Sequence, residues 1–333
     1  MASIGIRGVA ERAGVSVGTV SNALNHPEKV SAASLGRIRE AIAELGYVRN
    51  DAARMLRAGQ SQTIGLVVLD VRNPFFTDLA RGAEDEAVRH GMSVILGNSA
   101  EDSAREAGYL DLFEEQRVRG VLISPYGRID ERLRLLRERG IPAVLVDRAS
   151  SDRRVSSVSV DDVAGGRMAA AHLLQIGRRR IAFVGGPVGI RQVADRLTGA
   201  REAVASIDGA TLEVVPTAAL TVTEGRRAGR ALLASARMPD AVLAANDLVA
   251  LGVLETLVVE GSVRVPGDVA LIGYDDIDVA SAAMVPLSSV RQPTELIGRT
   301  AVGILLEEAA AAQPRPRQVV FQPELVVRAS SGG

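Results

Sequence analysis

The sequence predicts a small all-α helix-turn-helix headpiece followed by an α/β body made of two doubly wound parallel-sheet lobes. Two patterns in the 333 residues carry this prediction. Three short amphipathic helical segments occupy the first 46 residues, and from residue 62 onwards apolar runs of strand length alternate with helical segments. Such alternation indicates parallel sheets covered by helices on both faces. Because residues 62–330 form a longer stretch than one such sheet needs, we expect two lobes.

The headpiece helices are expected over residues 7–13, 17–25 and 32–45. Gly14 and Gly46 follow the first and third segments, where a helix commonly ends in a left-handed residue. Ser16 and Ser31 stand directly before the second and third segments, where a hydroxyl can cap a helix. Two helices joined by a short turn containing glycine form the helix-turn-helix arrangement.

A polar stretch over residues 48–60, with a short helix expected at 52–57, separates the headpiece from the body. Body strands are expected over residues 64–69, 93–96, 120–123, 143–146, 181–184, 241–244, 269–272, 319–321 and 324–327. Amphipathic helices are expected over residues 76–90, 104–116, 130–139, 163–175, 191–205, 224–235 and 248–259. The glycine-rich residues 184–189 lack the lysine of a nucleotide-binding loop, so we interpret them as a strand-to-helix turn.

Composition excludes several kinds of chemistry. The chain has no cysteine and three histidines, which excludes disulfides, thiolate metal sites and cysteine nucleophiles and argues against a histidine-based triad. The sequence therefore predicts no catalytic residue, no metal and no cofactor. No apolar run reaches the roughly 18–20 residues that a membrane span needs, and the start of the chain lacks a signal-peptide layout. A cytoplasmic protein without a membrane partner is expected.

The charge distribution indicates a nucleic-acid partner. Basic and acidic side chains nearly balance, 39 against 40, for a net charge of −1. The first sixty residues carry eight basic and five acidic side chains, so they hold +3 and leave −4 for the rest. A locally basic segment on an otherwise acidic protein is typical of a DNA-binding module.

Residues 9–16 and 19–25 resemble the DNA-binding headpiece of the lactose/galactose repressor family, and so do residues 43–47 and 50–56. The resemblance continues through the body, at residues 73–76, 245–247, 272–276 and 290–293. The resemblance covers nearly the whole chain in order. It therefore implies a ligand-responsive transcription regulator, namely a repressor that binds double-stranded operator DNA. It also implies a homodimer whose two-lobed body is similar to periplasmic sugar-binding proteins.

The resemblance assigns base reading to the start of the second helix, which meets base edges in the major groove. Val17 offers an apolar contact to a thymine methyl group, Gly18 allows close approach, and Asn22 can pair with adenine through two hydrogen bonds. From spacing alone Asn22 is equally a solvated surface amide; the resemblance favours the base reader. Phosphate contacts and caps are assigned to Ser16, Thr19, Ser21 and Asn25. His26 is either a backbone contact or an exposed loop residue.

The resemblance also assigns a role to the linker. Asn50, Arg54 and Leu56 match a hinge that folds on DNA, where the leucine wedges into the central base step from the minor groove. An apolar wedge of this kind unstacks one step and kinks the duplex.

Between the two lobes the resemblance implies a cleft for a small polar effector such as a sugar. Carboxylates, amides and an arginine bind the hydroxyls of such a ligand, because each hydroxyl both donates and accepts. An aromatic ring covers the apolar face of a sugar. The residues assigned to the cleft are Asp70, Asn73, Phe76, Asp147, Asp161, Arg196, Leu220, Asn246, Asp275 and Gln292. Leu220 stands where many relatives have a second aromatic ring, and for any one aspartate a strand-end or helix-capping role is the open alternative.

The expected domains are a headpiece (1–46), a hinge (47–61), an N-terminal lobe (62–161 and 290–320) and a C-terminal lobe (162–289 and 321–330). The chain should cross between lobes near Asp161, Ser289 and Phe321. The dimer interface is expected on the body, with helix 76–88 and the region 280–286 as candidates. The tail after Ala312 contains two prolines, so it cannot form the long helix that makes some relatives tetrameric.

Two other classes share parts of this pattern. A transport-type binding protein has the same body, but it requires export and has no use for the first sixty residues. An α/β enzyme is possible because a fold does not determine a function. The sequence shows no nucleophile–base pair, metal-ligand cluster or cofactor motif that would support an enzyme.

Overall fold

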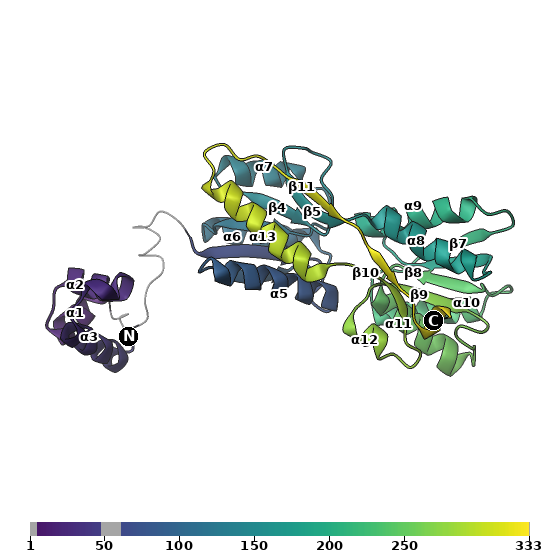
Figure 1. Ribbon diagram of the computed structural model, residues 1–333, viewed down its shortest axis with the longest axis horizontal. Helices are drawn as coiled ribbons and strands as arrows, with labels where there is room; N and C mark the ends of the chain where they lie inside the picture. The colour runs from purple at the N-terminus through teal and green to yellow at the C-terminus, as the bar shows by residue number, and fades with distance from the viewer. Residues whose placement is uncertain (1–4, 48–60, 333) are drawn as a thin grey trace. The chain divides into compact units, whose positions relative to one another are not determined.

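The structure is a computed structural model that describes residues 5–47 and 61–332 (Figure 1). The chain divides into two compact units, Met1–Gln60 and Ser61–Gly333. The second unit contains two six-stranded sheets with helices packed on both faces. The predicted fold class, a helical headpiece and two parallel-sheet lobes, is therefore confirmed. No helix in the described ranges is both long enough and apolar enough to span a membrane.

Within residues 5–47 the first unit has three helices and one 3-10 turn: α1 (Ile6–Ala13), α2 (Val17–Asn25), η1 (Pro27–Lys29) and α3 (Ala32–Leu45). The predicted caps are present. The hydroxyl oxygens of Ser16 and Ser31 accept hydrogen bonds from the first turns of α2 and α3. Gly14 and Gly46 end α1 and α3 with φ of 64° and 58°, a conformation that glycine adopts without steric cost.

A small core holds these three helices together. Val9, Ala13, Val20, Ile38 and Ala41 are buried and pack as one cluster. They recur at helical spacing, so each helix turns one apolar stripe inward. The outer face of α2 is thereby left to solvent.

The first sheet of the body has the strand order β11-β5-β4-β3-β1-β2, and all neighbours run parallel. Its strands are β1 (Thr63–Val68), β2 (Ser93–Asn98), β3 (Gly120–Ile123), β4 (Ala143–Val146), β5 (Ser156–Val160) and β11 (Gln318–Phe321). Its helices are α5 (Pro74–Arg89), α6 (Ser103–Glu115), α7 (Asp130–Glu138) and α13 (Thr294–Ala310). Ile64 and Leu66 pack in the core under α5 and α13, whereas Val67 packs with the residues of α6 and α7. The central strands are apolar throughout because both faces are covered.

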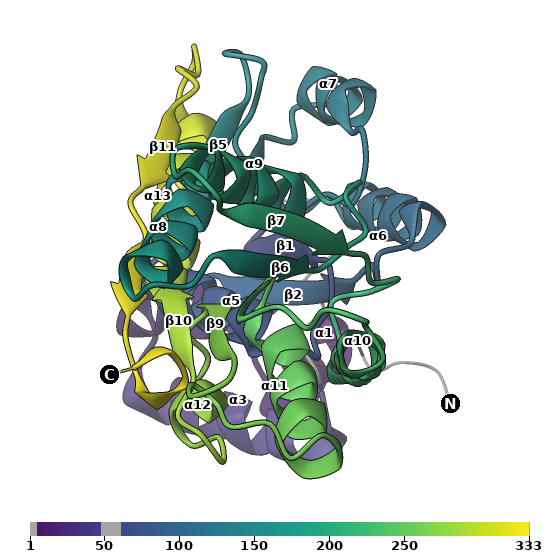
Figure 2. The same cartoon turned by 90° about the vertical axis from the view of Figure 1, so that its right-hand side faces the viewer.

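The second sheet has the order β12-β10-β9-β8-β6-β7, with β12 the one antiparallel strand. Its strands are β6 (Arg180–Val184), β7 (Thr211–Val215), β8 (Ala241–Ala244), β9 (Ala270–Asp275), β10 (Ser288–Arg291) and β12 (Glu324–Val326). Helices α8 (Asp162–Gln175) and α9 (Arg191–Ala205) lie on one side, with α10 (Val222–Leu233) and α11 (Asp247–Glu255) on the other (Figure 2). A π-helical turn, η2 (Thr256–Glu260), a short helix, α12 (Asp278–Ser281), and a 3-10 turn, η3 (Ala329–Ser331), complete this lobe.

The chain passes three times between the two sheets: after β5, after β10 and between β11 and β12. Parallel strands place all their carboxyl ends at one edge of a sheet. Asp147 follows β4 in the first sheet, and Asp275 ends β9 in the second.

Several expected elements need correction. Strands β5, β7 and β10 were not expected, because their serines, threonine and glutamate resemble loop sequence. The predicted helix at 248–259 is α-helical only to Glu255, and in the region 280–286 the helix ends at Ser281. The predicted hinge helix at 52–57 lies outside the described residues.

Candidate functional site

The outer face of α2 presents the three predicted base-reading residues. Val17, Gly18 and Asn22 are all exposed, and their spacing along the helix places them on one face. The Val17 side chain is 36% exposed, so it is accessible for an apolar contact.

The other predicted DNA contacts stabilise this helix. The Ser16 hydroxyl accepts a hydrogen bond from the Thr19 amide at 3.1 Å, and the two hydroxyls lie 2.9 Å apart. Asn25 donates to the Ser21 backbone oxygen at 2.8 Å. His26 ends the helix, with its Nδ1 3.5 Å from a carboxylate oxygen of Glu28. The hinge predictions Asn50, Arg54 and Leu56 lie outside the described residues.

A hollow of about 470 Å³, a volume that includes space open to solvent, lies between the two lobes of the body. It is bordered from both sides by strand ends and by the first turns of helices. Eight of the ten predicted effector residues line it: Asp70, Asn73, Phe76, Asp147, Arg196, Leu220, Asn246 and Asp275. Six further residues complete the lining: Leu69, Phe75, Glu101, Ile190, Gln192 and Val193.

Two predicted residues do not line the cleft. Asp161 is the N-cap of α8, where its carboxylate accepts a hydrogen bond from the Ala164 amide at 2.9 Å. Gln292 lies behind the lining and donates from Nε2 to Asp275 Oδ1 at 2.8 Å. Gln292 therefore positions a carboxylate that lines the cleft. The contacts of Asp161 are those of a helix cap, the alternative that the sequence left open.

Arg196 is the centre of a buried charge network. It is 5% exposed, and its Nε donates to Asp162 Oδ1 at 2.8 Å while its Nη1 donates to the Ala245 carbonyl at 2.7 Å. Nη1 also lies 3.8 Å from Asp275 Oδ1, and the guanidinium carbon is 3.7 Å from the ring centre of Tyr274. This arginine thus links α8, α9 and the end of β9.

Two hydrogen-bonded contacts cross the cleft from lobe to lobe. Asn73 of the first lobe donates from Nδ2 to Asp275 Oδ2 of the second lobe at 3.2 Å. Gln192 of the second lobe donates from Nε2 to both Oδ2 and the backbone oxygen of Asp147, at 2.6 and 2.7 Å. Residues that line the hollow therefore also join the two lobes.

The backbone is strained at both of these carboxylates. Asp147 has φ of 60° and Asp275 has φ of 108°. A residue other than glycine in this region costs of order 1–3 kcal/mol and persists only where the surrounding structure enforces it. Such strain concentrates at functional sites, and Asp276, next to Asp275, also has a positive φ of 55°.

The buried carboxylates outnumber the buried cations around this cleft. Burial raises the pKa of Asp147 well above its usual range, and the neighbouring charge of Asp162 raises it further. Burial raises the pKa of Asp275 to about 6, although Arg196 opposes the rise. Burial lowers the pKa of Arg196, but the carboxylates around it, Asp162 foremost, outweigh that effect and raise it.

Two residues that line the hollow have polar atoms without a partner in the described part of the chain. Asp147 Oδ1 and Gln192 Oε1 are buried, and neither has a hydrogen-bond donor among the described residues. Gln192 Oε1 is an acceptor, the Asp147 carboxyl can accept or, when it holds a proton, donate, and a buried polar atom without a partner is costly. The arrangement therefore favours a ligand that brings hydroxyl or other donor groups. No group of three or more potential metal-ligating side chains occurs in the described ranges.

The cleft has aromatic cover on one side. Phe75 and Phe76 meet edge to face, with ring centres 5.0 Å apart, and both line the hollow from the first lobe. Leu220 lines it from the second lobe. A ligand ring would thus lie between aromatic and aliphatic surfaces.

The sequence interpretation missed Gln192 and Asp162, the partners of Asp147 and Arg196. Gln192 sits in the first turn of α9, one turn before Arg196, and this i, i+4 spacing on one helix face was the available signal. Asp162 directly follows Asp161, and the sequence does not distinguish the capping aspartate from the one that pairs with arginine.

The stability of the body is expected to depend on pH through Asp275. Its folded-state pKa of about 6 lies above the ordinary carboxyl value, so the folded chain holds a proton that the unfolded chain has lost. Stability attributable to this group is therefore present below pH ~4 and is lost as pH rises towards 6, by at most about 3 kcal/mol. Urea unfolding at pH 4 to 7 should show that Asp275→Asn gains stability relative to the parent chain as pH rises. Parallel pH curves for the two proteins would contradict this expectation.

Comparisons with known proteins agree with both parts of the chain. Residues 5–50 match the domain family described as bacterial regulatory proteins, lacI family, and residues 170–331 match the periplasmic binding protein-like domain. The chain is 38% identical over 332 residues to the HTH-type transcriptional regulator CelR of Thermobifida fusca, with 97% of this chain and 96% of that protein covered. It is 36% identical over 304 residues to the ribose operon repressor of Bacillus subtilis (strain 168), with 90% of each covered.

Solved structures show the same similarity. The CelR–cellobiose complex is 34% identical, with a TM-score of 0.73, and the alignment covers 98% of this chain and 99% of that one. The Lac repressor dimer bound to operator and the anti-inducer ONPF is 26% identical, with a TM-score of 0.83 and the same coverage. The proteins named here are transcriptional regulators, and none is named as an enzyme.

Proposed function

Because this chain belongs to the lacI family of bacterial regulatory proteins and is a transcriptional regulator, we propose that it represses genes in the cytoplasm by binding a pseudo-palindromic operator as a homodimer. A small polyhydroxylated effector, a sugar or a related metabolite, enters the cleft and changes the affinity for the operator. The observation that carries this proposal is the polar cleft whose own residues join the two lobes.

The cleft chemistry supports a sugar-like effector. Its unpartnered oxygens, Asp147 Oδ1 and Gln192 Oε1, suit hydroxyl groups, which both donate and accept, and Phe76 offers a flat apolar face. The relatives support the same class, since one is named for a ribose operon and another was solved with cellobiose.

Coupling between cleft and operator follows from reciprocity. An effector that alters the contacts between Asp147 and Gln192, or between Asn73 and Asp275, changes the free energy of lobe closure. If operator binding favours one lobe arrangement, the effector changes the affinity for the operator by a certain factor. The operator then changes the affinity for the effector by the same factor. Whether the effector weakens or strengthens repression depends on which arrangement it favours.

Two measurements test the proposal. A thermal-shift screen of sugars, polyols and nucleosides should find a ligand that raises the melting temperature, because a ligand that binds only the folded state stabilises it. Gel shifts should show strong binding to a full pseudo-palindrome and far weaker binding to one half-site, because two headpieces bind together. Equal affinity for half and full sites would contradict the dimeric mode.

The dimer is expected to use exposed apolar side chains of the body. Val88, Ile95 and Leu96 lie exposed on α5 and β2, and Val279 and Met284 lie exposed in the second lobe. Association of two chains would remove such side chains from water. Sedimentation equilibrium should give twice the chain mass of 35.0 kDa. The Ile95→Asp variant should shift the measured mass towards that of one chain. The control Ile207→Asp, at an exposed isoleucine after α9, should keep the mass of two chains.

Base reading is expected to depend on Asn22. In the Asn22→Ala variant the amide is lost, so preference at one base position should fall by roughly 1–3 kcal/mol. Affinity for non-specific duplex should stay nearly unchanged, because phosphate contacts supply that binding. Selection from a random duplex pool measures the preference, and an unaltered sequence logo would show that Asn22 is a solvated surface amide.

A further inference from the structure

One edge of the first lobe carries a row of arginines without carboxylate partners. Arg117, Arg137, Arg153 and Arg315 are exposed. None of them has a carboxylate within ion-pair distance in the described ranges 5–47 and 61–332. By contrast, most exposed arginines of this lobe are paired, for example Arg134 with Glu138 at 2.6 Å.

Sheet topology brings these four residues to the same edge. Three of the arginines stand three residues before a parallel strand: Arg117 before β3, Arg153 before β5 and Arg315 before β11. The fourth, Arg137, is in the last turn of α7, the helix that leads into β4. Those strands are consecutive in the order β11-β5-β4-β3. At about 4.8 Å between neighbouring strands, the row extends over roughly 14 Å.

Local acids do not neutralise this row. The acidic side chains at the edge are Glu114, Glu115, Glu138, Asp152, Glu307 and Glu308. Four of the six are paired with arginines outside the row: Glu114 with Arg132 and Arg139, Glu138 with Arg134, Asp152 with Arg154, and Glu307 with Arg317. Glu308 accepts a hydrogen bond from the Ser156 hydroxyl, so two carboxylates, Glu115 and Glu308, stand against the four arginines of the row. The edge is therefore positive on a body whose sequence is acidic overall.

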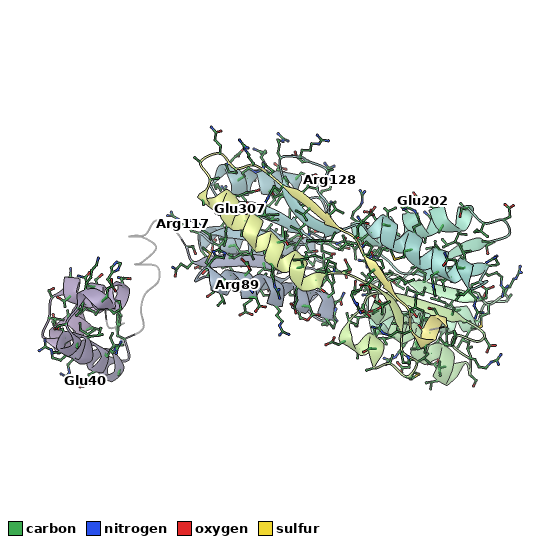
Figure 3. The ribbon with its side chains drawn as sticks, viewed as in Figure 1. Glu40, Arg89, Arg117, Arg128, Glu202 and Glu307 are labelled. Carbon is green, nitrogen blue, oxygen red and sulfur yellow. The ribbon has the colours of Figure 1, made fainter. Side chains whose placement is uncertain are left out.

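The same edge is where the chain enters from the headpiece. Strand β1 lies beside β3 in the sheet, and its amino end follows Ser61, the first described residue of the second unit. Figure 3 shows Arg117 at the end of the first lobe that is remote from the second lobe. Residues 48–60 can span at most about 50 Å when fully extended, so the covalent chain limits how far DNA held by the headpiece can lie from this edge.

From this juxtaposition we propose that the arginine row at the amino edge of the first sheet, Arg117, Arg137, Arg153 and Arg315, is a second DNA contact that binds duplex phosphates. The inference rests on the function proposed above. Guanidinium groups suit phosphate oxygens through paired hydrogen bonds. Such contacts would add affinity and salt dependence without reading sequence.

The test uses the full-length chain and a 40-base-pair duplex selected by that chain from a random pool. Binding is measured between 50 and 200 mM salt for the parent chain and for the quadruple variant Arg117→Gln, Arg137→Gln, Arg153→Gln, Arg315→Gln. Each lost phosphate contact should reduce the slope of log affinity against log salt by about 0.9. Because both protomers of the dimer carry the changes, eight contacts are lost, and the parent's affinity should fall over this range about 10⁴-fold more than the variant's.

A matched control removes charge elsewhere. Arg201 and Arg237 are also exposed and without an ion pair among the described residues, but they lie in the second lobe. The variant Arg201→Gln/Arg237→Gln should keep the parental slope. A quadruple variant with the parental slope and an unchanged melting temperature would overturn the inference. Absence of duplex binding by the parent chain would instead contradict the proposed function.

Discussion

Replacement of Arg196 by alanine is expected to destabilise the body by about 3–5 kcal/mol, the usual cost of leaving buried charges without their partner. The guanidinium contacts Asp162 and lies 3.8 Å from Asp275 Oδ1, and both carboxylates are buried. Its loss also removes the donor to the Ala245 carbonyl. The folded fraction should no longer respond to an effector, while the headpiece, a separate unit, should still bind operator.

Urea unfolding of the body measures the first effect, and operator gel shifts with and without effector measure the second. Arg201→Ala is the matched control, because Arg201 is exposed on the same helix, and surface changes of this kind usually stay within about 0.5 kcal/mol. In the double variant Arg196→Met/Asp162→Asn part of the stability should return, since both charges of the pair are then absent. An Arg196→Ala protein as stable as the parent would show that the carboxylates do not need this cation.

The second large effect is expected at Gly166, where α8 crosses α9. A Cβ atom there would lie 1.9 Å from the carbonyl oxygen of Arg196, and one at Gly199 would lie 1.9 Å from the carbonyl oxygen of Val163. The two backbones are therefore in contact, and Gly166→Ala must push the helices apart. We expect a loss of about 3 kcal/mol, at the upper end of overpacking costs, together with a weaker effector response, because α9 carries both Gln192 and Arg196.

Gly108→Ala is the control for this substitution. Gly108 lies within α6, and a Cβ atom there would meet nothing within 4 Å. Alanine at an open helical site is expected to stabilise by about 0.5–1 kcal/mol, since it reduces the freedom of the unfolded chain. Thermal unfolding of the two variants should therefore move in opposite directions. Equal melting temperatures would show that the α8–α9 crossing can relax at no cost.

Much of the fold could be predicted because its signals are local. The headpiece caps at Ser16 and Ser31, and the left-handed residues Gly14 and Gly46, depend on one helical turn of sequence. The central strands could be recognised because burial on both faces makes them apolar throughout. These features require no knowledge of what lies across the molecule.

The missed strands show where local pattern fails. β5 reads Ser-Ser-Val-Ser-Val and β10 begins with two serines, yet these strands are buried. The hydroxyls of β10 have distant partners: Ser289 donates to Asp247 Oδ1 at 2.7 Å, and Ser288 donates to the Arg328 carbonyl at 3.0 Å. A polar residue is stable in a core only when such partners exist, and sequence neighbours do not reveal them.

The sequence by itself therefore determined the family, the two-part architecture and eight of the residues that line the cleft. Only the tertiary structure decided which groups meet: Asp162 with Arg196, Gln192 with Asp147, and Gln292 behind Asp275. Residue type and periodicity report which face of an element is buried. The partner of a buried polar atom depends on which elements, far apart in sequence, pack against each other, and that packing is a property of the folded chain.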